Sequence, residues 1–315
     1  MKWLWRIAGG LLAVGLAGYF LWFCQQNLDL SLLADVLSQP RMALALTGAT
    51  VCYISIYPLA GWAWHHLLRR QGENHRTGKL ILWLGITQLA KYIPGNIAQH
   101  AGRTFIALRN GMKPRTLLTT CLQEMLLALA ASILIGALAL TLTTAQVEEP
   151  SLRLALQLMI VGSIAVCVLF CIELPEKAIN GLPAVVQHGL RLIGGLPGYR
   201  TTLRCLSAYA CNYLLVGLGI WLIALALGLG HQINYPLATA AFALSWALGF
   251  LAPGAPAGLG AREGIMLLIL QGHADAESIL LLTLLSRAVS MGGDFLTFLL
   301  ANSIKSMMQN PAGQR

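Results

Sequence analysis

The sequence predicts an all-α polytopic membrane protein with about six full spans and two re-entrant broken-helix hairpins arranged as an inverted repeat. Of its 315 residues, 57% are hydrophobic and only 10% are charged, whereas soluble domains average roughly 45–50% and 25%. Several separate apolar stretches reach about 20 residues, the length that crosses a hydrocarbon layer of roughly 30 Å. Two of these stretches carry Pro-Gly pairs, which interrupt helices. A soluble fold is therefore excluded.

The apolar runs fall, in order, at 4–23, 42–64, 80–108, 116–144, 152–172, 206–229, 236–271 and 279–304. Basic residues stand at the start of the first run, Lys2 before it and Arg6 near its beginning, and no convincing small-residue cleavage site comes after it, so we interpret it as an uncleaved span. The third and seventh runs contain Pro94-Gly95 and Pro253-Gly254. Because proline removes a helix donor and glycine loosens the backbone, each should split into two half-helices. The other runs should be uninterrupted spans.

Lysine and arginine set the predicted orientation, because the cytoplasmic loops of membrane proteins carry an excess of both. If the third run enters from the cytoplasm and returns there, nearly all loop Lys and Arg lie inside, and only Arg41 and Arg153 lie outside. The seventh run then begins and ends on the outer face. We expect two hairpins that enter from opposite sides of the membrane, with the N-terminus and the C-terminus in the cytoplasm.

An inverted repeat explains two hairpins of opposite direction. The residue spacing supports it, because Arg103 and Arg262 each lie nine residues after the proline of their own Pro-Gly pair. This match, at an offset of 159 residues, places one arginine in each hairpin. The two arginines should be related by a pseudo-twofold axis, as in transporters built from broken helices.

The domain organisation predicted from this repeat is a single integral membrane domain over 1–315. Repeat 1 covers approximately 42–172 and repeat 2 approximately 206–305. The segment 173–205 between them should form a cytoplasmic connection. Its mixture of apolar and basic residues fits a short helix lying on the membrane surface, or equally an ordinary loop helix.

Charged residues fall within the predicted membrane segments: Lys91, Arg103, Arg262, Arg287, Glu124, Glu263 and Asp294. A charge at the bilayer centre costs at least ~2.5–3.5 kcal/mol on insertion scales, so each must face protein, water or substrate. Some can be structural pairs, and Arg287 with Asp294, seven residues further along the same helix face, is the best candidate. Glu124 and Glu263 either exchange protons, which would couple transport to a proton gradient, or pair with an arginine of the second repeat.

The broken helices should create an anion site, because the N-terminus of a half-helix presents free N–H groups and a positive dipole end. The turns that open the half-helices are Pro94-Gly95-Asn96 and Pro256-Ala257-Gly258. Since guanidinium groups suit phosphate oxygens, we predict phosphate binding by Arg103, Arg262, Lys91, Arg287, Asn96, Gly95 and Gly258. His100, near Arg103, would relay protons, contact phosphate, or serve as a polar packing residue. The implied partner is an anionic lipid substrate.

Other classes of chemistry have no support in the sequence, and we predict no cofactor, no metal site and no catalytic residue. The seven cysteines lack the paired spacing of a zinc or redox site. No glycine-rich loop followed by Lys-Ser or Lys-Thr is present for ATP binding. The net charge of +9 follows from the topology, and the sequence has no soluble basic patch with interleaved aromatic residues. Nucleic acid is therefore not an expected partner.

Two stretches of the sequence resemble a known family. Lys91-Tyr92-Ile93-Pro94-Gly95-Asn96 with Gly102-Arg103, and Pro256 to Gly264, are similar to the signature stretches of the bacterial flippase-like family named after the membrane region of lysylphosphatidylglycerol synthase. The similarity covers approximately 5–305. The resemblance implies a multi-span inner-membrane protein that moves lipids with modified or sugar-bearing phosphate headgroups between leaflets. Without the soluble aminoacyl-transferase domain, it implies translocation without synthesis.

The function predicted from these features is a lipid translocase, or flippase, rather than an enzyme. The Lys-Tyr-Ile-Pro-Gly-Asn form is closer to family members associated with cell-envelope polysaccharides, which favours a polyprenyl-phosphate sugar over a modified phospholipid. One alternative is a membrane-embedded lipid-phosphate transferase, for which Glu124, Glu263 and His100 are the available bases. Another is a non-transporting partner of an envelope glycosyltransferase. An envelope glycosyltransferase or an aminoacyl transferase is the expected protein partner.

Overall fold

The computed structural model describes residues 35–92, 98–143, 149–172, 195–252 and 256–309, with isolated positions between 180 and 189. Within these residues the fold is all helical and contains no strand, although an isolated bridge joins Gln271 to Ala274. The predicted first span at 4–23 and much of the predicted connection at 173–205 lie outside the described residues, as do Pro94-Gly95-Asn96 and Pro253-Gly254. The predicted all-α class is confirmed.

The described helices, in chain order, are α3 (Pro40–Ile54), α4 (Ile56–Arg70), α5 (Thr77–Thr87), η1 (Gln88–Tyr92), α6 (Ala98–Arg109), α7 (Pro114–Thr143), α8 (Pro150–Cys171), α11 (Tyr199–Ala226), α12 (Tyr235–Leu251), η2 (Pro256–Gly258), α13 (Ala261–Leu270) and α14 (Ala276–Gln309). Proline occupies one of the first two positions of α3, α8 and α12, where its missing N–H would be unpaired in any helix. At the start of α12, Leu237 N also donates to the Asn234 side chain at 3.0 Å. Ser55, between α3 and α4, keeps a helical conformation, so these two helices form one long segment.

Five helical segments are long and apolar enough to cross a membrane: Pro40–Arg70, which joins α3 and α4, Pro114–Thr143, Pro150–Cys171, Tyr199–Ala226 and Ala276–Met308. They correspond to the predicted uninterrupted spans other than 4–23. α11 begins earlier than the predicted start at 206, and its first turn is attached to α8 by the buried Thr202, which donates to the Phe170 carbonyl at 2.8 Å. The protein is therefore a multi-pass membrane protein.

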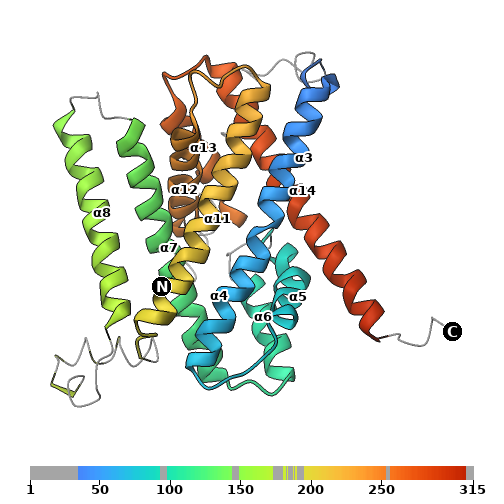
Figure 1. Cartoon of the computed structure of the whole chain (residues 1–315), viewed down its shortest axis with the longest axis vertical. Coiled ribbons are helices and arrows are strands. Elements are labelled where there is room, and N and C mark those ends of the chain that lie inside the picture. Colours follow the sequence, from blue (N-terminus) through green and yellow to red (C-terminus); the bar gives the residue numbers. More distant parts are fainter. Residues whose placement is uncertain are drawn as a thin grey trace, which may run out of the picture.

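Each of the two runs that contain Pro-Gly folds as a pair of short helices rather than as one long helix (Figure 1). α5 and η1 rise from the lower end of the molecule in this view, and α6 returns there; we call this pair the first hairpin. α12 descends from the upper end and α13 returns there, with η2 between them; this pair is the second hairpin. η1 contacts η2, so the tips of the two hairpins meet inside the molecule.

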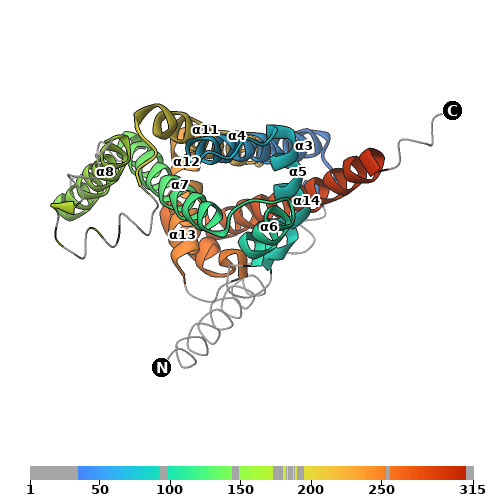
Figure 2. The ribbon, with the colours of Figure 1, turned by 90° about the horizontal axis from the view of Figure 1, so that it is seen from below.

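The described long helices pack against the two hairpins without covering their returning helices. Seen from below, α3, α4 and α11 lie along one side and α6 and α13 along the opposite side, with α12 and α14 between them (Figure 2). α8 lies at the edge of the molecule against α7. α12 packs on α7, α11 and α13, whereas α14 packs on α3, α5 and η1. Each hairpin is therefore held by helices from both halves of the chain.

Two apolar clusters hold this arrangement together. The larger one joins the long helices to the second hairpin and includes Met42 and Leu237, which are 0% and 1% exposed. The smaller one fixes the first hairpin, because Trp64 of α4 packs with Leu80 of α5 and with apolar residues of α6 and α7. Trp64 Nε1 also donates to Thr120 Oγ1 of α7 at 3.3 Å, which satisfies its buried N–H. The first hairpin is thus anchored on α4 and α7.

Candidate functional site

The charged residues predicted to lie in the membrane are brought together around the two hairpin tips. Three ion pairs form: Lys91 with Asp294 at 2.6 Å, Arg103 with Glu124 at 2.7 Å, and Arg287 with Glu263 at 3.2 Å. Every acid of the predicted set is used in these pairs. Among the described residues, Arg262 is left without a carboxylate partner.

Asp294 is the centre of the largest polar network. Its side chain on α14 is 0% exposed. Besides the Lys91 ammonium, its carboxylate accepts hydrogen bonds from the hydroxyls of Tyr53, Tyr57 and Tyr92 and from Gln88 Nε2. These donors come from α3, α4 and η1, so the network ties the tip of the first hairpin to three long-helix elements. A buried carboxylate is tolerated only when it is paired and hydrogen-bonded in this way.

The predicted pair of Arg287 with Asp294 is wrong. The two residues share a helix, but Asp294 forms its ion pair with Lys91 of η1. Arg287 instead contacts Glu263 of α13. Tertiary packing decides the pairing. The hairpins bring Lys91 close to Asp294 and Glu263 close to Arg287, whereas Arg287 and Asp294 are separated by seven residues along α14.

The Arg103 side chain is held on three sides. Its Nη1 and Nη2 donate to the two carboxylate oxygens of Glu124 at 3.1 and 2.7 Å, a bidentate arrangement. Its guanidinium lies 4.3 Å from the centre of the Trp64 ring, and His100 Nδ1 is 3.3 Å from Nη2. Arg103 is 4% exposed and joins α6 to α7. Its role as a phosphate ligand stays a prediction.

Glu263 occupies the N-terminus of α13. Its Oε2 accepts a hydrogen bond from Gly260 N at 2.7 Å, while Oε1 faces Arg287 Nε. Arg287 Nη1 also donates to the Ala257 carbonyl at 3.4 Å. The helix N-terminus predicted to attract the substrate anion therefore already holds a carboxylate of the protein. The corresponding residues of the first hairpin, Gly95 and Asn96, lie outside the described part of the chain.

The two hairpins use the same type of ion pair with the charges exchanged. In the first, Arg103 of α6 pairs with Glu124 of the following long helix, α7. In the second, Glu263 of α13 pairs with Arg287 of the following long helix, α14. The returning helix of each hairpin is thus tied to the next long helix by one buried ion pair.

A cavity of about 1130 Å³, counting the open space at its mouth, lies between the hairpins and α3, α7 and α11. One part of its wall is polar and is formed by Gln88, Gln99, His100, Tyr209, Asn212 and Arg262. Another part is aromatic and is formed by Tyr213, Phe242, Trp246 and Phe250. A concave site with an apolar lining and a few convergent polar groups is typical of a ligand pocket.

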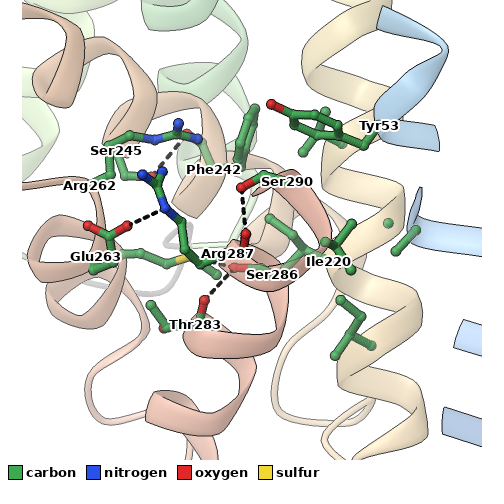
Figure 3. A pocket seen from close by; sticks show the side chains of 16 residues that line it. Tyr53, Ile220, Phe242, Ser245, Arg262, Glu263, Thr283, Ser286, Arg287 and Ser290 are labelled. Carbon is green, nitrogen blue, oxygen red and sulfur yellow. Dashed lines mark hydrogen bonds and ion pairs between the residues drawn. The ribbon is translucent and has the colours of Figure 1, made fainter. Parts of the chain in front are cut away.

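Arg262 lies between this cavity and a smaller neighbouring one of about 480 Å³, and it lines both (Figure 3). Its guanidinium is 5.3 Å from the centre of the Phe242 ring. Figure 3 shows Arg287 beside it, with Glu263 on the far side of Arg287. Two glycines make room for the side chain: a Cβ at Gly249 would lie 2.2 Å from Arg262 Cγ, and one at Gly258 would lie 2.7 Å from Cδ. Gly258 also has a φ of +72°, which favours glycine.

Sequence reasoning missed several polar residues of the cavity wall, among them Tyr209 and Asn212. Tyr209 is 4% exposed, and its hydroxyl has no hydrogen-bond partner among the described residues. The Oδ1 atom of Asn212 on the same helix is likewise buried and without a partner there. A signal was available, because a tyrosine and an amide three positions apart interrupt the apolar run 206–229 on one helix face. Tyr53 and Tyr57, four residues apart, were also missed, although their spacing places them on one helix face in the same way.

The sequence that forms this cavity matches a known protein family. Residues 8–296 match the family described as the lysylphosphatidylglycerol synthase TM region. A search of curated proteins gives no match. The family match covers the helices that form both hairpins, the three ion pairs and the cavity. The chain therefore belongs to the lysylphosphatidylglycerol synthase TM region family.

Proposed function

We propose that this protein is a flippase that moves an anionic, phosphate-bearing lipid across a bacterial inner membrane. The observation that carries the proposal is Arg262, a cation in a cavity wall with no carboxylate partner among the described residues. A charge in the membrane interior is costly unless a partner compensates it. A lipid phosphate would supply that partner, since its oxygens match the guanidinium fork.

The proposed topology has six full spans, with 4–23 as the first, and two re-entrant hairpins that enter from opposite sides. Three observations support it. The first hairpin occupies the lower part of the molecule and the second the upper part (Figure 1). Their ion pairs to the following long helices have exchanged charges. Arg103 and Arg262 lie at an offset of 159 residues. We propose an inverted repeat over 42–172 and 206–305, with both termini cytoplasmic.

Transport would proceed by alternate opening of the two hairpins around the phosphate site, while the lipid tails stay in the bilayer. The Lys91–Asp294 pair joins the tip of the first hairpin to α14, and η1 contacts η2. Separating these tips would open the cavity on one side. The ion pairs of Arg103 and of Glu263 would keep each returning helix attached to its long helix during this motion.

A translocase accounts for the side chains better than a transferase does. A transferase needs a free base or nucleophile beside the phosphate. Glu124 and Glu263 are both engaged in ion pairs, which leaves His100 as the cavity residue of that set without an ion pair. We therefore propose a transporter, supplied with its lipid by an envelope glycosyltransferase or an aminoacyl transferase. A polyprenyl-phosphate sugar and a modified phospholipid are the candidate substrates.

A leaflet-resolved assay in liposomes tests the proposal. Purified protein is reconstituted with a fluorescent phosphatidylglycerol, and the fraction of probe reached by an external quencher is followed with time. Arg262→Gln should slow transport about tenfold or more, because a charge-assisted contact worth about 1.5–3 kcal/mol is lost. Arg115→Gln, an exposed arginine on α7, is the matched control and should transport like wild type. Equal rates for wild type and Arg262→Gln would overturn the proposal.

A further inference from the structure

We infer that the cavity selects a lipid whose headgroup is a monoanionic phosphodiester ending in a neutral, hydroxyl-bearing group. The inference rests on the proposed function and specifies the substrate of the same site. It excludes diphosphate lipids, phosphomonoesters and lipids with a cationic headgroup. Two independent features carry it: the charge balance around Arg262 and the unpartnered polar atoms of Tyr209 and Asn212.

The charge balance leaves room for one negative charge. Among the described residues, the cations around the hairpin tips are Lys91, Arg103, Arg262 and Arg287, and the acids Glu124, Glu263 and Asp294 each neutralise one of them. His100 adds no charge, because its Nδ1 faces the Nη2 donor of Arg103 at 3.3 Å and must accept there, as a neutral imidazole does. The described site therefore carries a single uncompensated positive charge at Arg262.

A phosphodiester matches this charge, since it carries one negative charge at neutral pH. A phosphomonoester carries about −1.5 to −2 at pH 7 because its second pKa is about 6, and a diphosphate linkage carries two negative charges. Either would bring an unmatched charge into a site whose low dielectric makes such a charge costly. The site thus distinguishes phosphate groups by charge as well as by shape.

Tyr209 and Asn212 indicate what lies beyond the phosphate. Within the described part of the chain, Asn212 Oδ1 is an acceptor without a donor and the Tyr209 hydroxyl is unpaired, although both residues line the cavity. Buried polar atoms cost free energy when unpaired, so a ligand that pairs them is favoured. A hydroxyl group satisfies both, because it donates and accepts. An ammonium would also donate, but Glu124, the carboxylate lining this cavity, is already neutralised by Arg103.

The aromatic part of the wall fits the carbon side of a polyol. Trp246 and Phe250 are stacked, with ring centres 5.3 Å apart and planes 8° apart, and Tyr213 lies 5.5 Å from Trp246. Tyr213 is tilted by 60° against Trp246, so the three rings form an angled apolar wall in a cavity that also holds the polar Tyr209 and Asn212. A hydroxyl-bearing headgroup has C–H faces for such a surface and hydroxyl edges for the polar atoms.

Competition binding to the purified full-length protein in nanodiscs tests the inference. Fluorescent phosphatidylglycerol is displaced by lipids with identical acyl chains: phosphatidylglycerol, phosphatidylmethanol, phosphatidic acid and lysyl-phosphatidylglycerol. We expect phosphatidylglycerol to compete best. Phosphatidylmethanol, which lacks headgroup hydroxyls, should be about fivefold weaker. Phosphatidic acid at pH 7.5 and the cationic lysyl lipid should each be about tenfold weaker. Glycerophosphoglycerol, the same headgroup without acyl chains, should compete far less well.

Variants assign the selectivity to the named residues. The double variant Tyr209→Phe with Asn212→Ala should bring the preference for phosphatidylglycerol over phosphatidylmethanol close to one. Tyr199→Phe, an exposed tyrosine on the same helix, is the matched control and should keep the wild-type preference. Glu124→Gln releases Arg103 from its partner and should shift the preference toward phosphatidic acid. Elution profile and thermal unfolding in detergent verify that each variant is folded.

Some results would overturn the inference. Equal binding of phosphatidylglycerol and phosphatidylmethanol by wild type would remove the hydroxyl requirement. Stronger binding of phosphatidic acid or of the lysyl lipid would refute the charge argument, and equal competition by glycerophosphoglycerol would refute a lipid ligand. If these results occur while Arg262→Gln still slows transport about tenfold or more, the inference fails and the flippase stands. If Arg262→Gln transports like wild type, the proposed function itself fails.

Discussion

Individual residues show how this protein keeps charges inside a membrane. Asp294 receives an ammonium, three tyrosine hydroxyls and an amide, so its buried carboxylate is fully surrounded by donors. Removing one partner of such a pair leaves an uncompensated charge, whereas removing both leaves none. The Lys91–Asp294 pair is therefore a structural lock at the tip of the first hairpin.

Substitutions of this pair should be strongly non-additive. Lys91→Met alone should destabilise the protein by about 3–5 kcal/mol, because it strands the Asp294 charge. The double variant Lys91→Met with Asp294→Asn should be less destabilised than the sum of the single variants. Unfolding in detergent, followed by circular dichroism against denaturant, measures the coupling. Additive effects would mean that the two side chains do not interact.

The sequence identified the buried charges but not their partners. Apolar runs interrupted by Lys, Arg, Asp or Glu are visible in any hydropathy profile. Pairing depends on contacts between segments far apart in the chain, such as Tyr92 and Asp294, which are 202 residues apart. A rule based on neighbours along one helix could not find them, and it selected Arg287 for Asp294 instead. Tyr209 and Asn212 were missed because attention went to the charged residues, although their three-residue spacing on one helix face was visible in the sequence.

At the scale of elements, the Pro-Gly pairs predicted where each run breaks into two helices. The hydrogen bonding at the break between α12 and α13 was not predicted. Glu263 accepts a hydrogen bond from Gly260 N and so occupies the N-terminus of α13, which was expected to hold phosphate. The G-x-x-E spacing from Gly260 to Glu263 is a capping pattern that the sequence already contained. The cation at Arg262, rather than the helix end, is left for a ligand.

Gly249 of α12 connects helix packing to this ligand site. Gly249→Ala should stabilise α12 by up to about 1 kcal/mol through helix propensity, yet displace Arg262, whose Cγ would lie 2.2 Å from the new Cβ. We expect unchanged or higher thermal stability together with weaker binding of fluorescent phosphatidylglycerol. Gly264→Ala on α13 is the control, since a Cβ there meets nothing within 4 Å. Undiminished lipid binding by Gly249→Ala would contradict the placement of the site.

At the scale of the whole molecule, hydropathy predicted the all-helical class and the five spans that the described residues contain. In Figure 1 the first hairpin lies in the lower part of the molecule and the second in the upper part, and this arrangement is compatible with entry from opposite faces, which stays a prediction. The contact of η1 with η2 could not be predicted from the sequence, because no local pattern specifies that the two hairpin tips touch. That contact is what encloses a cavity between the two halves.

The orientation is tested by thiol labelling in a cysteine-free chain that still transports. A cysteine placed by Lys113→Cys, in the exposed loop between α6 and α7, should react with an impermeant maleimide only after cell lysis. A cysteine placed by His231→Cys, in the exposed loop between α11 and α12, should react in intact cells. Labelling of both positions from the same side would contradict hairpins that enter from opposite faces.

The central claim is that Arg262 holds the phosphate of a lipid in the cavity between the hairpins. Native mass spectrometry of the protein released from phosphatidylglycerol nanodiscs measures this directly, as the fraction of molecules that retain one lipid. Wild type and the Arg115→Gln control should retain one phosphatidylglycerol, and Arg262→Gln should lose it. Retention of the lipid by Arg262→Gln in the same proportion as by wild type would contradict the claim.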